Sequence, residues 1–191
     1  MRRLHYFVAV SLDGFIASPS GAFDAFPLDG DHITAQLQEL PETLPTPVRD
    51  ALRITTPGTT FDTVLMGANT FEVGRTPSPY SHLHQYVFSR TRSRRGVGDN
   101  VVLSSDDPIE LVRRLKSEPS PRDIWLCGGG KLAAALIDEV DVLTLKVNPI
   151  AFGSGIRVFE SPNYAPRRFT LTSTRRFESS VVWNRYERAR D

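Results

Sequence analysis

The chain has 191 residues, of which 40% are hydrophobic and 24% charged, and its formal net charge is +1. This composition predicts a single globular domain over residues 1–191, excludes extensive disorder, and provides no electrostatic drive toward nucleic acid. No apolar run is long enough to cross a membrane, and the single cysteine, Cys127, excludes an internal disulfide. We therefore expect a cytoplasmic protein that begins at Met1 and whose partner is a small molecule or a second copy of itself.

The chain opens with an apolar strand and continues into a polar loop. Leu4 to Leu12 is rich in apolar and aromatic residues, ends at the turn signal Asp13-Gly14, and the apolar pattern resumes at Phe15 to Ala17. We predict that this strand is the central one of a sheet. Ser18 to Gly30 is dense in Gly, Pro, Ser and Asp, and loops of this length inside compact domains are often functional.

Two helices are expected after this loop. The first, over His32 to Leu40, would place Ile33, Leu37 and Leu40 on one face before Pro41 stops it. A second, shorter helix is expected over Val48 to Ile54.

Two short apolar strands then end in residues suited to phosphate. Thr63 to Met66 is followed by Gly67-Ala68-Asn69-Thr70, where Asn69 or Thr70 is predicted to cap a short helix. Gln85 to Phe88 is followed by Ser89-Arg90. The basic cluster completed by Arg92, Arg94 and Arg95 is either a solvated loop or a guanidinium fork for a phosphate.

The third strand end, after Ile124 to Cys127, carries three glycines. Gly128, Gly129 and Gly130 permit a sharp turn and a close approach to the backbone. A helix is expected from Leu132, with Leu136, Ile137 and Val140 at helical spacing. This turn is predicted to bind a phosphate, and the alternative is a tight turn without a ligand. The sequence contains neither a P-loop motif nor a Gly-x-Gly-x-x-Gly motif.

The remaining elements change character along the chain. Val101 to Leu103 and Val142 to Val147 are predicted strands, separated by a helix that Asp107 opens and that runs to about Lys116. The alternation of strands and helices predicts an α/β fold with a largely parallel sheet flanked by helices. Antiparallel strands are expected to complete the sheet, over Arg157–Phe159, Phe169–Thr174 and Ser180–Tyr186.

Four stretches together resemble the dihydrofolate-reductase-like superfamily, and most closely the stand-alone relatives of the C-terminal reductase domain of riboflavin-biosynthesis deaminase-reductases. They are Ser11-Leu12-Asp13-Gly14-Phe15-Ile16-Ala17, Val64 to Glu72, Trp125-Leu126-Cys127-Gly128-Gly129-Gly130 and Asn148 to Phe159. Their order and spacing cover nearly the whole chain. The resemblance implies a mixed, mostly parallel central sheet with helices on its faces, and NADPH bound across it.

The resemblance also implies which residues hold the cofactor. Gly128, Gly129 and Gly130 would receive the pyrophosphate, with a cis peptide between the first two, and Lys131 and Leu132 would follow at the helix start. Gly67, Asn69 and Thr70 match the second phosphate turn. Ser89 and Arg90 match the strand end that meets the adenosine 2′-phosphate, and Ala17 would lie near the nicotinamide.

The substrate side departs from the family pattern, because the acid that dihydrofolate reductases place at the start of the first helix has no clear match. Asp29 is nearest by counting, with Asp24 and Asp31 as rivals, and Asp13 lies in a stretch that riboflavin-type domains keep near substrate. Each of these acids is also a candidate turn or capping residue. No metal is expected, since His82 and His84 have no acidic or cysteine partners nearby.

Three functions follow from these patterns. The leading hypothesis is an NADPH-dependent reductase that transfers hydride to a C=N or C=O bond of a small pterin-like, aminouracil-like or sugar-derived substrate. The alternatives are a nucleotide-binding module without turnover and a phosphate-binding protein unrelated to nicotinamide. The resemblance also implies a homodimer, with the C-terminal strands as its candidate interface.

Overall fold

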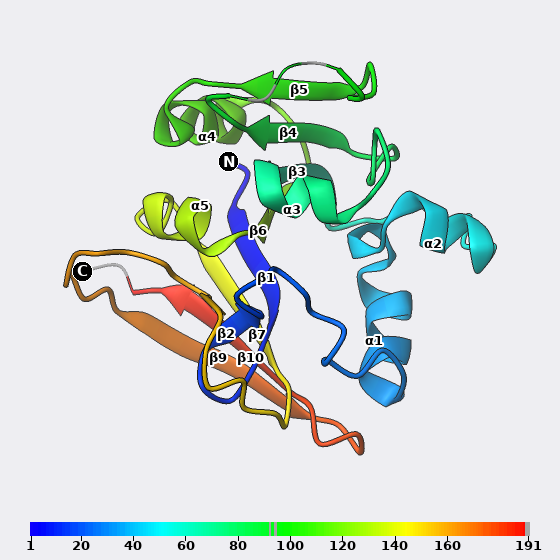
Figure 1. Cartoon of the computed structure of the whole chain (residues 1–191), viewed down its shortest axis with the longest axis vertical. Coiled ribbons are helices and arrows are strands. Elements are labelled where there is room, and N and C mark those ends of the chain that lie inside the picture. Colours follow the sequence, from blue (N-terminus) through cyan, green and yellow to red (C-terminus); the bar gives the residue numbers. More distant parts are fainter. Residues whose placement is uncertain (92, 94, 190–191) are drawn as a thin grey trace.

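The computed structural model describes residues 1–91, 93 and 95–189. Its centre is an eight-stranded sheet with the order β5-β4-β3-β6-β1-β7-β10-β9. In that order the strands are Val101–Ser104, His84–Phe88, Phe61–Gly67, Asp123–Gly128, Leu4–Val10, Val142–Val147, Val182–Arg188 and Phe169–Arg176. The first six are parallel, whereas β10 pairs antiparallel with both β7 and β9. The predicted mixed sheet, with β1 near its middle, is confirmed (Figure 1).

The helices divide between the two faces of the sheet. They are α1 (Asp31–Glu39), α2 (Thr46–Ala51), α3 (Ala68–Val73), α4 (Pro108–Ser117) and α5 (Gly130–Ala135), with a 3-10 turn at Pro41–Thr43. Figure 1 shows α4 and α5 on one side of the central strands and α1 and α2 on the other.

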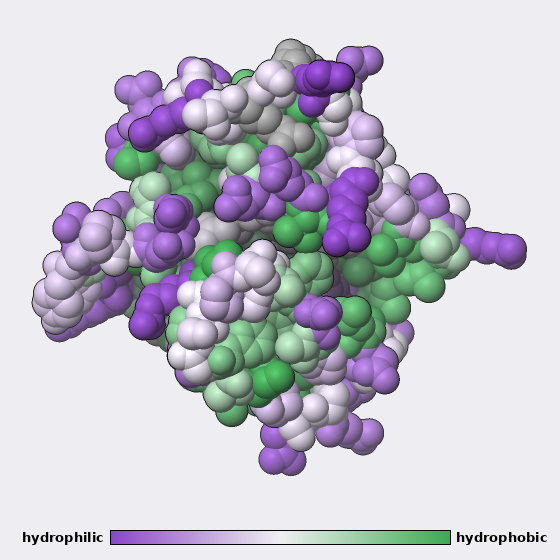
Figure 2. Space-filling model, viewed as in Figure 1, coloured by the Kyte–Doolittle hydropathy of each residue, from purple (hydrophilic) through white to green (hydrophobic). Residues whose placement is uncertain are grey.

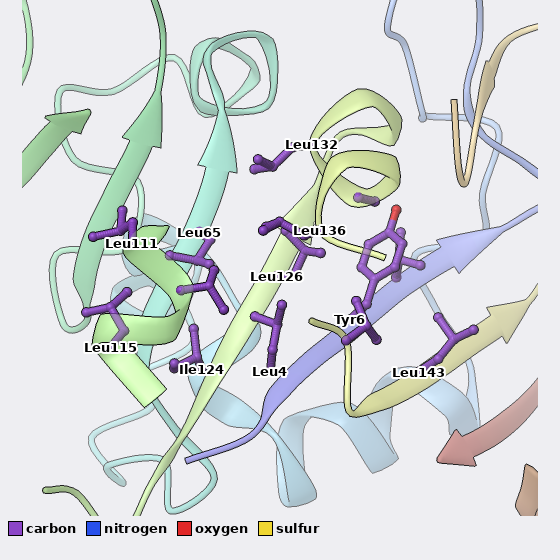
Figure 3. Packing of buried hydrophobic residues seen from close by; sticks show 14 residues of the cluster. Leu4, Tyr6, Leu65, Leu111, Leu115, Ile124, Leu126, Leu132, Leu136 and Leu143 are labelled. Atoms are coloured by element: carbon purple, nitrogen blue, oxygen red, sulfur yellow. The ribbon is translucent and has the colours of Figure 1, made fainter. Parts of the chain in front are cut away.

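Alternation along the strands gives each face its own core. On the α4 and α5 face, Tyr6 of β1 and Leu126 of β6 pack with Leu115 and Leu136 (Figure 3). On the α1 and α3 face, Phe7 and Trp125 pack with Phe71 of α3. Because successive strand residues point to opposite faces, burial on both sides explains the nearly continuous apolar strands of the sequence.

The buried face of α1 differs from the prediction. His32, Ala35 and Gln36 are buried, whereas the predicted apolar face of Ile33, Leu37 and Leu40 is only partly buried. The polar residues are buried because they have partners: His32 Nδ1 lies 2.8 Å from Ser179 Oγ, and Gln36 Nε2 donates to Thr43 Oγ1 at 2.8 Å. Burial of a polar group is tolerated when it is hydrogen-bonded.

Two predictions about helix ends were wrong. The helix expected to reach Val140 ends at Ala135, although Leu136 and Val140 are still buried in the core beyond it. Neither Asn69 nor Thr70 caps α3, because Gly67 occupies the cap position. By contrast, the expected cap of α4 is present, with Asp107 Oδ1 accepting from the amide of Ile109 at 2.7 Å.

The expected strand near Arg157 does not join the main sheet. Ile156–Arg157 (β8) pairs antiparallel with Phe15–Ala17 (β2) in a separate two-stranded sheet. The other two C-terminal strands complete the main sheet as predicted. Across the described ranges, no helix has the length and apolar character that a membrane span requires.

Candidate functional site

The strand register brings the three predicted phosphate turns to one edge of the sheet. Met66 of β3 pairs with Gly128 of β6, and Gly67 pairs with Phe88 of β4. The turns after β6, β3 and β4 therefore leave the sheet side by side, at the carboxyl ends of parallel strands, where ligands of open α/β sheets bind. Figure 2 shows the surface hollowed along the boundary between α3 and β2, with apolar residues bordering the hollow.

The turn after β6 presents bare backbone. The peptide between Gly128 and Gly129 is cis, as the resemblance implies. Chain neighbours aside, the one described atom within 4 Å of a Cβ added to Gly128 is Thr70 Oγ1, at 3.9 Å, and a Cβ added to Gly129 would meet the same oxygen at 3.4 Å. A ligand can thus approach these two glycines closely, and the Thr70 hydroxyl borders the same space.

Gly130 has a different reason to be glycine. A Cβ there would overlap the carbonyl oxygen of Arg157, so this residue lets the start of α5 contact the chain around β8. The amide of Glu160 also donates to the carbonyl of Gly130 at 3.0 Å. This packing contact explains why residue 130 is a glycine, and the role of Gly130 toward phosphate stays a prediction.

The side chains of the two residues after Gly130 have other surroundings, and their predicted role at the cofactor stays a prediction. Leu132 is 8% exposed and packs in the core beside Leu136 (Figure 3). Lys131 is exposed, with its ammonium 3.9 Å from Glu160. Since α5 has only six residues, its N-terminus contributes only the dipole of a short helix.

The end of β4 brings Ser89 and Arg90 to this edge of the sheet. The amide of Ser89 donates to the carbonyl of Ser104 at 3.0 Å, which continues the β4–β5 pairing beyond Phe88. Arg90 follows at once and is exposed. Arg92 and Arg94 of the predicted basic cluster lie outside the described residues. Nearby, a cavity of about 230 Å³ is lined by Phe71, Glu72, Arg75, Thr76, Pro77 and Gly96.

Asp13 fastens two loops together. Its carboxylate accepts hydrogen bonds from Ser11 Oγ at 2.6 Å, from the amide of Phe152 at 3.0 Å and from the amide of Gly153 at 2.7 Å. The bond from Ser11, followed by those from the two amides, lowers the pKa of Asp13 to about 2. The carboxylate is therefore ionised at neutral pH, and its contacts favour the turn role over the proton-donor role.

The other candidate acids do not converge on the site. Asp24 and Asp29 are exposed on the loop before α1. Asp31 accepts from the amides of Glu178 at 2.8 Å and Ser179 at 3.2 Å. Partial burial opposes ionisation of Asp31, but these bonds outweigh it and lower its pKa. Asp31 thus ties α1 to the turn between β9 and β10, and the catalytic roles of Asp24 and Asp29 remain predictions.

Ala17 ends β2, where the chain approaches another glycine closely. Ala17 is 8% exposed, and a Cβ on Gly155 would overlap its carbonyl oxygen. The Gly153-Ser154-Gly155 stretch is therefore part of a turn packed against β2. Ala17 stays close to the end of β1, because the amide of Ser11 donates a 2.8 Å hydrogen bond to the carbonyl of Phe15, which lies in the same strand as Ala17.

One polar residue near this edge escaped the sequence analysis. Lys146 lies in β7, opposite Ala9 of β1, and its ammonium donates to Gln36 Oε1 at 2.7 Å. The same nitrogen lies 4.7 Å from the centre of the Phe7 ring. Burial lowers the pKa of Lys146 to about 8. The available signal was a single charged residue inside the apolar run Val142–Val147.

A second buried group at this edge is the thiol of Cys127. It lies 3.9 Å from the hydroxyl of Tyr80. Burial raises the pKa of Cys127 to about 12, so the thiol is protonated at neutral pH and is a poor nucleophile. The predicted structural role of this cysteine fits that environment. Within the described ranges, no three His, Cys, Asp or Glu side chains gather into a group able to hold a metal ion.

Comparisons with known proteins cover nearly the whole chain. A family model described as the RibD C-terminal domain matches residues 2–183. The uncharacterized protein YyaP of Bacillus subtilis is 28% identical over 207 residues, covering 96% of each protein.

Two solved structures share the fold. The first, a putative riboflavin biosynthesis protein from Shewanella sp. PV-4, is 22% identical with a TM-score of 0.69, and the similarity covers 98% of this chain and 99% of that one. The second is the diaminohydroxyphosphoribosylaminopyrimidine deaminase/5-amino-6-(5-phosphoribosylamino)uracil reductase of Thermotoga maritima, 18% identical with a TM-score of 0.62. The similarity covers 98% of this chain and 57% of the Thermotoga maritima chain. At these identities the structures establish the fold alone.

Proposed function

Because the chain belongs to the family of the RibD C-terminal domain, we propose that it is an NADPH-dependent reductase. Its substrate would be a small pterin-like, aminouracil-like or sugar-derived molecule with a reducible C=N or C=O bond. When bound, NADPH supplies a hydride from C4 of its nicotinamide ring to the carbon of that bond.

The observation that carries this proposal is the open backbone at Gly128 and Gly129, aligned with the turn after β3. Among the described residues other than the chain neighbours, only Thr70 Oγ1 lies within 4 Å of the positions that Cβ atoms would take on these glycines, so the space suits a pyrophosphate. Backbone amides and a hydroxyl are the donors that phosphate oxygens need. Arg90, beyond the end of β4, would bind the 2′-phosphate through its guanidinium.

The chain's own contribution is binding and orientation. The turns at Gly67 and Gly128 would hold the phosphates, and the bend that ends at Ala17 would position the nicotinamide end. Fixing two reactants in a reactive geometry supplies a large part of the rate enhancement in such reactions. The proton would come from an ordered water or an acid of the substrate side, since Asp13 and Asp31 are both held by backbone amides.

A binding assay followed by a turnover assay tests this function. Thermal unfolding is recorded with NADPH, NADH, NADP+ and buffer. A ligand at about a hundred times its Kd stabilises a protein by roughly 2.7 kcal/mol, which a chain of this size shows as several degrees. NADPH oxidation is then followed with a dihydropterin, a diaminouracil and a keto-sugar. No stabilisation by any nicotinamide nucleotide would defeat the proposal.

The alternative is a nucleotide-binding module of the same fold without turnover. The observation that favours it is the exposure of Asp24 and Asp29, together with the structural engagement of Asp13 and Asp31. This alternative predicts a clear shift with NADPH and no oxidation of NADPH with any of the three substrates.

A homodimer is a separate proposal. Its support is β9, an edge strand whose residues after Phe169 are all exposed, with Leu171 53% exposed. An exposed edge strand with unpaired backbone groups is a ready template for pairing with another chain. Light scattering at several concentrations tests it, and Thr172→Pro should shift a dimer toward monomer. A monomer at every concentration would defeat it.

A further inference from the structure

Lys146 is a cation on the face of the sheet that α1 covers. Its register partners are Ala9 of β1 and Trp183 of β10. It lies against the Phe7 ring, and its one hydrogen bond in the described chain goes to Gln36 of α1. An ammonium has three donors, so this contact leaves it incompletely satisfied.

Among the described residues, no carboxylate forms an ion pair with this ammonium. Lys146 makes no ion pair within the described ranges, and the titratable group that acts on its pKa besides burial is the thiol of Cys127 on β6. Burial raises the pKa of Cys127 to about 12, so this thiol is uncharged at neutral pH. A partly buried charge without a partner is costly, and an anionic ligand would remove that cost.

The same patch has a second unsatisfied donor. The indole N–H of Trp183 is buried and has no hydrogen-bond partner among the described residues. Trp183 is 8% exposed, and its ring lies 5.6 Å from the Phe7 ring that Lys146 also contacts. Lys146 and Trp183 therefore both carry N–H donors that the described residues do not fully satisfy, and the half-buried ammonium favours a ligand that brings acceptor oxygens.

The sheet face is partly open at this point. Ala9, Cys127 and Lys146 are all half-buried. The neighbouring residues Phe7 and Trp183 are buried, with 2% and 8% of their surface exposed. Cys127 directly precedes Gly128, so the opening adjoins the turn assigned to the cofactor.

We propose that Lys146 is the specificity-determining residue of the substrate site, and that it selects substrates carrying a carboxylate or another anionic oxygen. The assignment of Lys146 to a substrate site rests on the proposed reductase function. The preference for an anionic oxygen rests only on the surroundings of Lys146. The ligand oxygen would accept from the ammonium on the side away from Gln36 and supply the missing counter-charge.

Matched ligand pairs test this preference without turnover. Calorimetric titrations compare pterin-6-carboxylate with 6-hydroxymethylpterin, and orotate with 6-methyluracil, because each pair differs chiefly in the carboxylate. The proteins are the wild type, Lys146→Met, Lys146→Arg and the control Arg176→Met, which removes an exposed cation on strand β9, two strands away and on the opposite face of the sheet. Each is titrated with and without NADP+.

The wild type and Arg176→Met should bind a carboxylate at least tenfold more tightly than its neutral partner. Lys146→Met should reduce this ratio below twofold, and Lys146→Arg should keep part of it. Absence of binding, equal affinities within both pairs, or a preference that survives in Lys146→Met would each overturn the inference. Failure of NADP+ to bind would instead defeat the proposed function. The carboxylate preference would then be decided by the titrations without NADP+, which compare each carboxylate with its neutral partner.

Lysine NMR gives a readout that a merely structural role would not move. The chain has three lysines, Lys116, Lys131 and Lys146, so their side-chain signals can be assigned with single variants. The pKa of Lys146 should rise from about 8 when pterin-6-carboxylate is added. The side-chain signals of Lys116 and Lys131 should not change when the ligand is added. An unchanged Lys146 signal at saturating carboxylate would contradict direct contact.

Discussion

The hydroxyl of Thr70, on α3, faces Gly129, in the turn after β6: a Cβ on Gly129 would lie 3.4 Å from Thr70 Oγ1. Two turns that are far apart in the sequence therefore border a single space. The pairing of Met66 with Gly128 produces this relationship, because it ends the two strands at the same level of the sheet.

This geometry gives Thr70 a measurable role. Thr70→Val keeps the volume and removes the hydroxyl, so we expect NADPH affinity to fall about tenfold, which corresponds to about 1.4 kcal/mol. Thr172→Val on β9 is the matched control, since its hydroxyl donates to the Arg185 carbonyl away from the turns. Equal NADPH affinities in a fluorescence titration of the two variants would remove Thr70 from the site.

The neighbouring glycines should respond differently to alanine. Gly130→Ala should lower the free energy of unfolding by about 1–3 kcal/mol, because its Cβ would overlap the Arg157 carbonyl. Gly129→Ala, whose Cβ is in ordinary contact with Thr70, should stay within about 1 kcal/mol of the wild type. It should nevertheless bind NADPH at least tenfold more weakly. Urea unfolding and nucleotide titration separate the two effects, and similar stability losses would contradict the assigned roles.

Arg90 should decide between NADPH and NADH. Arg90→Ala removes a guanidinium at the end of β4, so we expect NADPH affinity to fall about 10- to 100-fold with NADH affinity unchanged. Arg176→Ala, an exposed cation on the distant edge strand, controls for net charge. A parallel loss for both nucleotides would point to a structural effect of the substitution.

Asp13 should couple loop order to pH. The folded-state pKa of Asp13 is about 2, below its ordinary value of 3.8, so the stabilisation is complete above pH 3.8 and is lost as the pH falls through 2. Asp13→Asn should accelerate hydrogen exchange at the amides of Phe152 and Gly153 at neutral pH, because they donate to this carboxylate. Unchanged protection of both amides would show that the loop is held by other contacts.

His5 should make stability fall on the acid side. Burial, reinforced by the charges of Arg185 and Arg3, lowers the pKa of His5 from 6.5 to about 3. Between these values the unfolded chain binds a proton that the folded chain does not, so stability decreases as the pH falls from 6.5 toward 3. The contribution has a slope of up to about 1.4 kcal/mol per pH unit. The unfolding free energy of His5→Asn, measured beside the wild type by urea titration, should show a flatter dependence in this window; parallel curves would contradict the assignment.

Much of the fold followed from local patterns. The strand sequences are apolar on both faces, and the Asp107 cap and the alternation of strands with helices are signals contained within short segments. The three phosphate turns could be predicted as neighbours for the same reason, because parallel strands all end at one edge. The resemblance to a known superfamily added the cis peptide between Gly128 and Gly129, which no local pattern predicts.

What the sequence alone determined was the α/β sheet, its central strand and the edge where the glycine turn lies, since hydrophobic periodicity and turn residues are local properties. Only the tertiary structure decided the role of each side chain at that edge. Gly130 packs against Arg157, the Asp13 carboxylate accepts from the Gly153 amide, and Lys146 donates to Gln36 of α1. Each of these contacts joins residues from separate segments of the chain. Their roles depend on distances that no periodicity encodes.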